Sequence, residues 1–99
     1  MNKNTEIATE IRNQIGGKAL YMIGAKNLAA GDNYLSFRIG RNSKNVNYVK
    51  IVLNGLDLYD IEYGKIYGTK YTVKSSENNL YFDMLHKSIE SNTGMYTSL

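Results

Sequence analysis

Hydrophobic residues recur at helical spacing near both ends of the chain. In each of these segments the apolar positions fall three or four residues apart, which places them on one face of a helix. Two adjacent glycines follow the first segment and Gly94 follows the second, and glycine commonly ends a helix. The pattern predicts helices over residues 5–15 and about 80–92. The stripe residues are Ile7, Ile11 and Ile15 in the first helix, and Tyr81, Met84, Leu85, Ser88 and Ile89 in the second.

Between the helices, apolar and polar residues alternate with the period of two that is typical of β-strands. Leu35, Phe37 and Ile39 point to one side of the clearest strand. The connection over residues 25–33 ends in strong turn chemistry, Gly-Asp-Asn. Because the connections between strands are short, consecutive strands must pair antiparallel as a meander. The expected strands cover residues 18–24, 34–39, 47–53, a segment that runs from the next turn to about 66, and 69–74.

Asn54-Gly55 is the strongest hairpin signal in the chain, because both residues tolerate positive φ. A two-residue loop would bring Asp60 opposite Val49 on the buried face. An odd loop, of three residues or two residues longer, keeps the apolar residues of both strands together. The three-residue version also sets Lys50 opposite Asp60. Since a slip of one residue inverts every side chain, the odd loop with a bulge is favoured.

The alternation also predicts that one face of the sheet is buried and the other is open. The two helices must cover the buried face, so we expect a single α+β domain over residues 1–99. Its architecture is a two-layer sandwich, with a four- to five-stranded antiparallel meander sheet and an N-terminal and a C-terminal helix on one face. The expected core residues are Ile7, Ile11, Phe37, Ile51, Ile61, Val73 and Leu85, with Tyr71 also pointing inward. The expected open-face residues are Tyr34, Arg38, Tyr48, Lys50, Lys70 and Lys74.

The composition narrows the chemistry that the chain can support. It has no Cys and one His in 99 residues, which excludes a disulfide framework, a thiolate zinc site, a cysteine nucleophile and a multi-histidine metal site. No apolar run approaches the ~20 residues of a membrane span, and the polar N-terminus is unlike a signal peptide. We therefore expect a soluble cytoplasmic protein with no cofactor, no metal and no membrane contact.

Few residues combine into a catalytic or metal site. His86 has acids as its neighbours on the second predicted helix, which is typical of a solvated helix face. Asp60 and Glu62 share a strand face and could hold a hard cation, but pairing with Lys50 across the strands is the more ordinary arrangement. The glycine-rich stretch at 64–68 lacks the spacing of a phosphate-binding loop. We expect that the chain is not an enzyme.

A basic segment with interleaved tyrosines is the strongest functional lead. Residues 38–50 carry no acid, and the first fifty residues hold eight Lys or Arg against three Asp or Glu. Rings that stack on bases and cations that follow phosphates bind single-stranded nucleic acid. An ordinary solvated sheet face and a protein interface rich in Tyr and Arg fit the same pattern, and the net charge of the chain is only +3. The candidate residues for binding a partner or nucleic acid are Tyr34, Arg38, Arg41, Lys44, Tyr48 and Lys50.

Four motifs are spread over nearly the whole chain. They are Ile-x-x-Gln-Ile-Gly-Gly at 11–17, Gly-Ala-Lys-Asn at 24–27, Leu-Asp-x-Tyr-Asp at 56–60 and Thr-Gly-x-Tyr-Thr-Ser-Leu at 93–99. In this combination the chain resembles a family of small, uncharacterised proteins that are encoded by bacteriophages, plasmids and integrative mobile elements. The resemblance implies a small, non-enzymatic accessory protein of a mobile element, and it carries no functional residues with it.

Two functions fit these observations. The first is an accessory protein that binds and blocks a host nucleoprotein or defence component, as inhibitors of CRISPR effectors do. The alternative is a single-stranded nucleic-acid-binding accessory protein that uses the basic, tyrosine-bearing sheet face. Either protein would act in the cytoplasm of the bacterial host. An unpaired edge strand could also join two copies into a homodimer.

Overall fold

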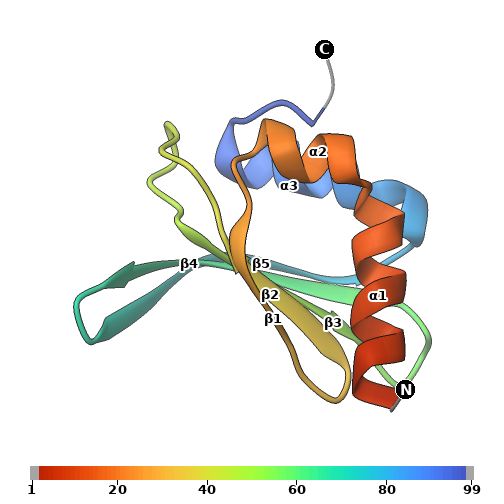
Figure 1. The fold of residues 1–99 in the computed structure, drawn as a ribbon. Helices are drawn as coiled ribbons and strands as arrows, with labels where there is room; N and C mark the ends of the chain where they lie inside the picture. Colours follow the sequence, from red (N-terminus) through yellow and green to blue (C-terminus); the bar gives the residue numbers. More distant parts are fainter. Residues whose placement is uncertain (1–2, 98–99) are drawn as a thin grey trace.

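A five-stranded antiparallel sheet carries all the helices on one of its faces (Figure 1). The computed structural model describes residues 3–97, with side chains from Glu6 onward, so the last two residues of the C-terminal motif lie outside the described part. The sheet order β1-β2-β3-β4-β5 is the predicted meander, and the α+β two-layer architecture is confirmed. The elements are α1 (Lys3–Ile15), α2 (Gly17–Met22), β1 (Lys26–Ala30), β2 (Tyr34–Arg38), β3 (Tyr48–Leu53), β4 (Tyr59–Tyr67), β5 (Lys70–Leu80), the short 3₁₀ helix η1 (Phe82–Met84) and α3 (Leu85–Thr93).

The core lies between the helices and the inner face of β2, β3 and β4. Phe37 and Ile51 point to this same face and are fully buried, as the alternation predicts. Ile11 and Leu85 reach them from the helices, and Ile7 is partly buried at the edge of the core. The buried core residues are Ala8, Ile11, Ile15, Ala19, Leu20, Ile23, Leu35, Phe37, Ile39, Val46, Val49, Ile51, Tyr59, Ile61, Tyr63, Leu80, Leu85 and Ile89.

The hairpin between β3 and β4 has the longer of the two odd loops. Leu53 pairs with Tyr59 and Ile51 pairs with Ile61, which leaves five residues in the loop. The apolar residues of both strands therefore share the buried face. Lys50 lies opposite Glu62 instead of Asp60, because the three-residue version does not form.

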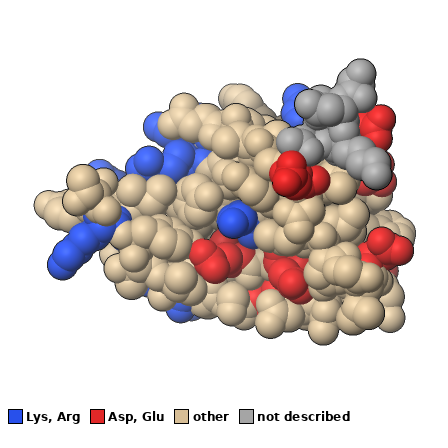
Figure 2. Space-filling model, turned by 90° about the horizontal axis from the view of Figure 1, so that it is seen from below, with Lys and Arg blue, Asp and Glu red and all other residues tan. Residues whose placement is uncertain are grey.

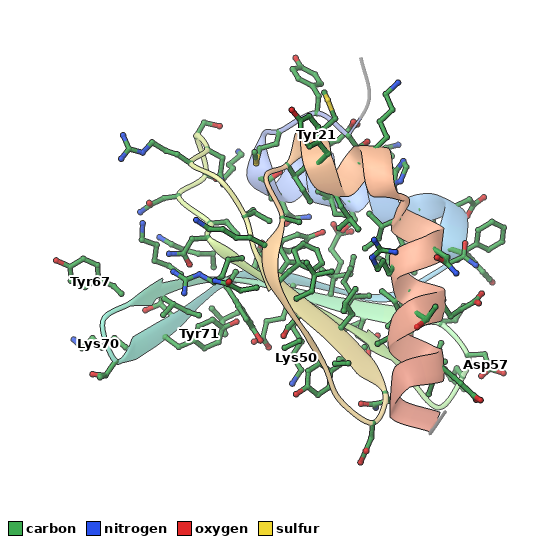
Figure 3. All side chains as sticks on the ribbon, in the orientation of Figure 1. Tyr21, Lys50, Asp57, Tyr67, Lys70 and Tyr71 are labelled. Atoms are coloured by element: carbon green, nitrogen blue, oxygen red, sulfur yellow. The ribbon has the colours of Figure 1, made fainter. Side chains whose placement is uncertain are left out.

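The expected strand over residues 18–24 is a helix. Ala19, Leu20 and Ile23 are buried, and their spacing of one, three and four residues is the spacing of a helical face. Tyr21 between them points to solvent (Figure 3). The strand that pairs with β2 lies later, at β1, inside the expected connection. The run of apolar residues was too short to distinguish a buried helix from a strand by periodicity.

A bulge in β5 overturns the predicted orientation of Tyr71 and Val73. Tyr63 pairs with Ser75, but the next residue of β4, Gly64, pairs with Val73, so Lys74 is an extra residue in β5. The extra residue inverts the alternation, and Val73 is 52% exposed instead of buried. Tyr71 moves to the open face for the same reason. The strand also continues through residues 75–79, where a turn was expected.

The C-terminal helix starts later than predicted. The chain is still extended at Leu80, and Tyr81 and Met84 are exposed at a 3₁₀ turn that precedes α3. The helix ends at Gly94, whose φ of 73° is the left-handed conformation expected of a C-cap. Within residues 3–97, no helix combines the length and apolar character that crossing a bilayer requires.

Candidate functional site

The structure divides the six predicted binding residues between the two sides of the sheet. Tyr34, Arg38, Tyr48 and Lys50 lie on the open face of β2 and β3. Arg41 and Lys44 belong to the loop over residues 39–47, which folds toward the helices. Gly40 N donates to the carbonyl of Ile23 at 3.0 Å, and a Cβ at Gly94 would lie 2.5 Å from Ser43 Oγ, so this loop packs against the ends of α2 and α3 (Figure 1). The six residues do not form one surface.

Tyr34 is already packed against the protein on the open face. A Cβ at Gly31 would lie 1.9 Å from the Tyr34 ring, so the ring occupies the space that a side chain would take there. The Nζ of Lys50 lies 4.5 Å from the centre of the same ring, within the range of a cation–π contact. The Tyr34 ring is therefore not a free platform for stacking.

Tyr48 and Tyr71 form a second packed arrangement on this face. Their ring centres are 5.4 Å apart at an interplanar angle of 82°, an edge-to-face contact. The Tyr71 hydroxyl donates to Glu62 Oε2 at 2.6 Å, and its ring lies over Gly64, where a Cβ would be 2.4 Å away. Burial, the hydrogen bond to Glu62 and the charge of Glu62 raise the pKa of Tyr71. A shallow hollow of ≈ 290 Å³ is lined by the two rings together with Lys50, Glu62 and Ile66.

Charge on the open face is mixed. Glu62 is the register partner of Lys50, and Asp60, two residues before Glu62, lies on the same side of β4. Figure 2, which views this face, shows acids and bases side by side at the middle and bases toward the end that carries the β4–β5 hairpin. The acid-free segment 38–50 therefore does not produce a basic sheet face. The prediction that Lys70 lies on the open face was also wrong. Lys70 pairs with Tyr67, and both lie on the side opposite to Tyr71.

The β4–β5 hairpin projects beyond β3 as an arm, which we define as residues 65–72 (Figure 1). The Asn47 side chain holds its base through two bonds, donating to Ile66 O at 2.8 Å and accepting from Ile66 N at 2.7 Å. Lys65 Nζ donates to Asn45 Oδ1 at 2.6 Å. These contacts tie the arm to the 39–47 loop, although some twenty residues separate the two in sequence.

Asn42 gives the loop its shape. Its Nδ2 donates to the carbonyls of Gly40 at 2.9 Å and Val46 at 2.6 Å, and its Oδ1 accepts from Val46 N at 3.1 Å. One side chain thus closes the loop, which leaves Arg41 and Lys44 exposed on it. Asparagine suits this role because its short amide carries both donors and an acceptor.

An open cleft of ≈ 630 Å³ lies between the loop and the base of the arm. Arg41 lines it from the loop and Lys65 from the arm, and its other lining residues are apolar, glycine or asparagine, without an acid. Lys44 and Lys70 are exposed on the same two segments. We call this space the basic cleft; of the four cations, Arg41 and Lys65 line it, and Lys44 and Lys70 lie on the segments that border it.

Sequence reasoning missed the lysines of the arm. Lys65 and Lys70 lie in the half of the chain where acids outnumber bases, and only the contact of β4 with the loop brings Lys65 to the cleft that Arg41 lines. A local signal was present, because residues 63–76 contain three lysines and no acid. Averaging the charge over half of the chain concealed that run.

A polar network between the sheet and α3 is the other conspicuous cluster. The Tyr63 hydroxyl contacts Ser88 Oγ at 2.8 Å, Ser88 donates to Glu77 Oε1 at 2.7 Å, and Asn92 Nδ2 donates to the same oxygen at 2.5 Å. Burial raises the pKa of the Tyr63 phenol. Since Ser88 and Tyr63 are buried, this network fixes the position of α3 on the sheet and does not face a substrate.

His86 is bonded to the backbone. Its Nε2 lies 2.6 Å from the carbonyl oxygen of Ile15, so the ring joins α3 to the end of α1. The described part of the chain holds no group of three His, Cys, Asp or Glu side chains placed to bind a metal. No protein-family model, no curated protein and no solved structure matches the sequence or the fold.

Proposed function

We propose that this protein binds nucleic acid through the basic cleft and has no enzymatic activity. The observation that carries the proposal is the contact between the acid-free loop over residues 39–47 and the acid-free arm at one end of the molecule. Cations on both walls of an open cleft fit a phosphate backbone, because a backbone presents negative charge at regular intervals. The site therefore differs from the sheet face expected from the sequence.

The distribution of charge favours approach from this end. Asp57 lies at the end of the molecule opposite to Lys70 and the arm (Figure 3). A chain with a net charge of +3 is weakly basic as a whole, but on the open face the bases lie toward the hairpin end while acids lie at the middle and toward the opposite end, which favours a positive potential near the cleft (Figure 2). An anionic polymer would be steered to the cleft and repelled from the opposite end.

The resemblance to proteins of mobile elements gives this binding a context. We propose that the protein acts in the bacterial host, on the nucleic acid of the element or on a host nucleoprotein that the element must evade. Blocking a nucleoprotein by occupying its nucleic acid requires only a phosphate-binding surface, without catalytic residues.

The salt dependence of binding tests the proposal. We expect a labelled oligonucleotide to bind at ~50 mM salt and the affinity to fall steeply toward ~200 mM, because bound phosphates release counterions. Arg41→Ala and Lys65→Ala should each reduce the slope of log affinity against log salt by about 0.9 and weaken binding to all sequences alike. Lys87→Ala, an exposed cation near the start of α3, is the matched control and should leave the slope unchanged. Absence of binding at low salt, or an equal effect of Lys87→Ala, contradicts the proposal.

A protein partner on the open face is the second candidate function. The hollow between Tyr48, Tyr71, Lys50 and Glu62 supports it, because aromatic rings beside paired charges are typical of protein interfaces. In this case a host protein should be captured from lysate after nuclease treatment. Tyr48→Ala should abolish capture and Arg41→Ala should retain it. The opposite pattern, loss with nuclease and with Arg41→Ala, supports the basic cleft alone.

A further inference from the structure

We propose that the arm inserts into the major groove of a double-stranded nucleic acid, an inference that rests on the proposed function. The arm is a two-stranded antiparallel ribbon whose tip, residues 67–70, lies beyond all other strands (Figure 1). It extends three residues past Gly64, which at ~3.3 Å per residue is about 10 Å. The 39–47 loop holds Lys65 and Ile66, so the tip at residues 67–70 is the part that is free to enter a groove. The major groove of B-DNA is ~12 Å wide and ~8.5 Å deep and admits such a ribbon, whereas the minor groove, ~6 Å wide, is narrower than a ribbon with its side chains.

The two sides of the arm differ in chemistry. Tyr67 and Lys70 form one pair and Lys65 and Thr72 another, so these four share one side. Tyr71 lies on the opposite side, against the sheet (Figure 3). The first side, which is the helix side of the sheet, thus offers two ammonium groups and two hydroxyls, which donate to base edges and phosphates.

Tyr67 is placed for contact with a partner. Its side chain is 78% exposed at the tip of the arm, where it contributes little to the core. The turn beside it is made by Gly68, whose φ of 62° is left-handed and brings the chain back within two residues. A rigid aromatic side chain on the most projecting turn of the molecule is the first group to enter a groove.

A single strand fits this surface less well. Single-strand binders stack successive bases on open aromatic rings. On this sheet Tyr34 is covered by Gly31 and Lys50, and Tyr48 and Tyr71 contact each other. Glu62 and Asp60 would also repel a backbone that followed the open face. Arg41 and Lys65 instead line the cleft at the base of the arm, where the backbone of a duplex lies when a ribbon occupies its groove.

Comparison of a duplex with its own single strand tests the inference. Fluorescence anisotropy with labelled DNA of one sequence should give at least about tenfold tighter binding to the duplex at equal salt. Tyr67→Ala should remove most of this preference, and Tyr67→Phe should retain part of it if the ring makes contact. Tyr21→Ala, which changes an 85% exposed tyrosine on α2, is the matched control and should leave both affinities unchanged. Protection of guanine N7 from methylation should locate the arm in the major groove.

The outcomes separate the two proposals. Failure of both DNA forms to bind at low salt contradicts the proposed function itself. Equal or tighter binding of the single strand, or a duplex affinity that Tyr67→Ala does not change, overturns the groove inference and leaves phosphate binding by the cleft in place. Protection of the minor groove alone also overturns it.

Discussion

Gly64 supports a tyrosine ring in the space where another residue would place its own side chain. The ring of Tyr71 fills the position that a Cβ on Gly64 would occupy, and Tyr34 does the same over Gly31. A glycine within a strand lowers stability because it has no side chain to pack, but an aromatic ring from the neighbouring strand restores the lost packing. Each of these tyrosines therefore has a structural role on a face that the sequence marked as open for ligands.

We expect Gly64→Ala to destabilise the protein by about 1–3 kcal/mol, because the methyl group must displace the Tyr71 ring and its bond to Glu62. Denaturant unfolding measures the change. Gly17→Ala is the control, since nothing lies within 4 Å of its added Cβ and it should be neutral or slightly stabilising. If the ring is the cause, Gly64→Ala should cost less in a Tyr71→Ala background than in the wild type.

Because of Tyr63, the free energy of unfolding depends on pH in the alkaline range. Burial raises the pKa of this phenol, so the folded state holds its proton more tightly than the unfolded chain, in which tyrosine titrates near pH ~10. Its contribution is present below pH ~10 and is lost as pH rises above that value. Tyr63→Phe should lower stability by about 0.5–1.5 kcal/mol at neutral pH through loss of the bond to Ser88. The difference from wild type should shrink above pH ~10, and a constant difference would contradict this account. Tyr21→Phe, at an exposed position, should leave stability at neutral pH unchanged.

At the scale of elements, one asparagine organises the loop between β3 and β4. Asn54 Oδ1 accepts from the backbone of Leu56 at 2.8 Å and Leu58 at 3.2 Å, and its Nδ2 donates to Asp60 at 3.0 Å and to Asn79 at 2.8 Å. These bonds explain why the loop has five residues instead of two or three. They also tie the turn to the far end of β5.

Asn54→Ala should therefore cost about 1–3 kcal/mol of unfolding free energy, because several polar groups lose their partner at once. Thermal unfolding measures the loss. Asn78→Ala, at an exposed position of β5, is the control and should change stability by less than about 0.5 kcal/mol. Equal effects of the two substitutions would show that the Asn54 network does not stabilise the loop.

Elements with long, regular patterns were predictable from sequence, and irregular ones were not. The helix over the stripe of Ile7, Ile11 and Ile15 and the inward Leu35 and Phe37 of β2 depend only on the local period, and the structure has both, although Ile7 is partly buried and the outward Ser36 is buried as well. The helix α2 is only six residues long, so its periodicity could not be told from that of a strand. The bulge at Lys74 has no local signal, because pairing with β4 creates it. The candidate site depended on that pairing too, which is why Arg41 was found and Lys65 was not.

At the scale of the whole molecule, both edges of the sheet are interrupted. The pairing of β1 with β2 shifts between Lys26 and Ala29, where Asn27 has a φ of 56°. The pairing of β5 with β4 shifts at Lys74 and again before Leu80. Bulges and lysines on edge strands hinder pairing with another chain. The arrangement disfavours the edge-strand homodimer that an uninterrupted edge would permit.

We therefore expect sedimentation velocity to give a monomer in the absence of nucleic acid across the accessible protein concentrations. A dimer that persists at low concentration would contradict this expectation. Backbone hydrogen exchange at β1 and β5 then identifies the cause: slow exchange at the outer amides of either strand in the dimer would show that this edge forms the interface.

Lys74 also constrains how genes for such a protein can change. Inserting one residue into β4 between Tyr63 and Gly64, opposite Lys74, would remove the bulge, so that Tyr71 and Val73 would turn toward the helices while the pairs at the tip exchanged sides. A single in-frame insertion would thus invert the surface of an entire hairpin without altering any other amino acid. Among descendants that keep the same binding mode, the number of residues between Tyr63 and Tyr67 should be inherited unchanged, even where the residues themselves diverge. In this segment, selection would have to preserve the number of residues more strictly than their identity.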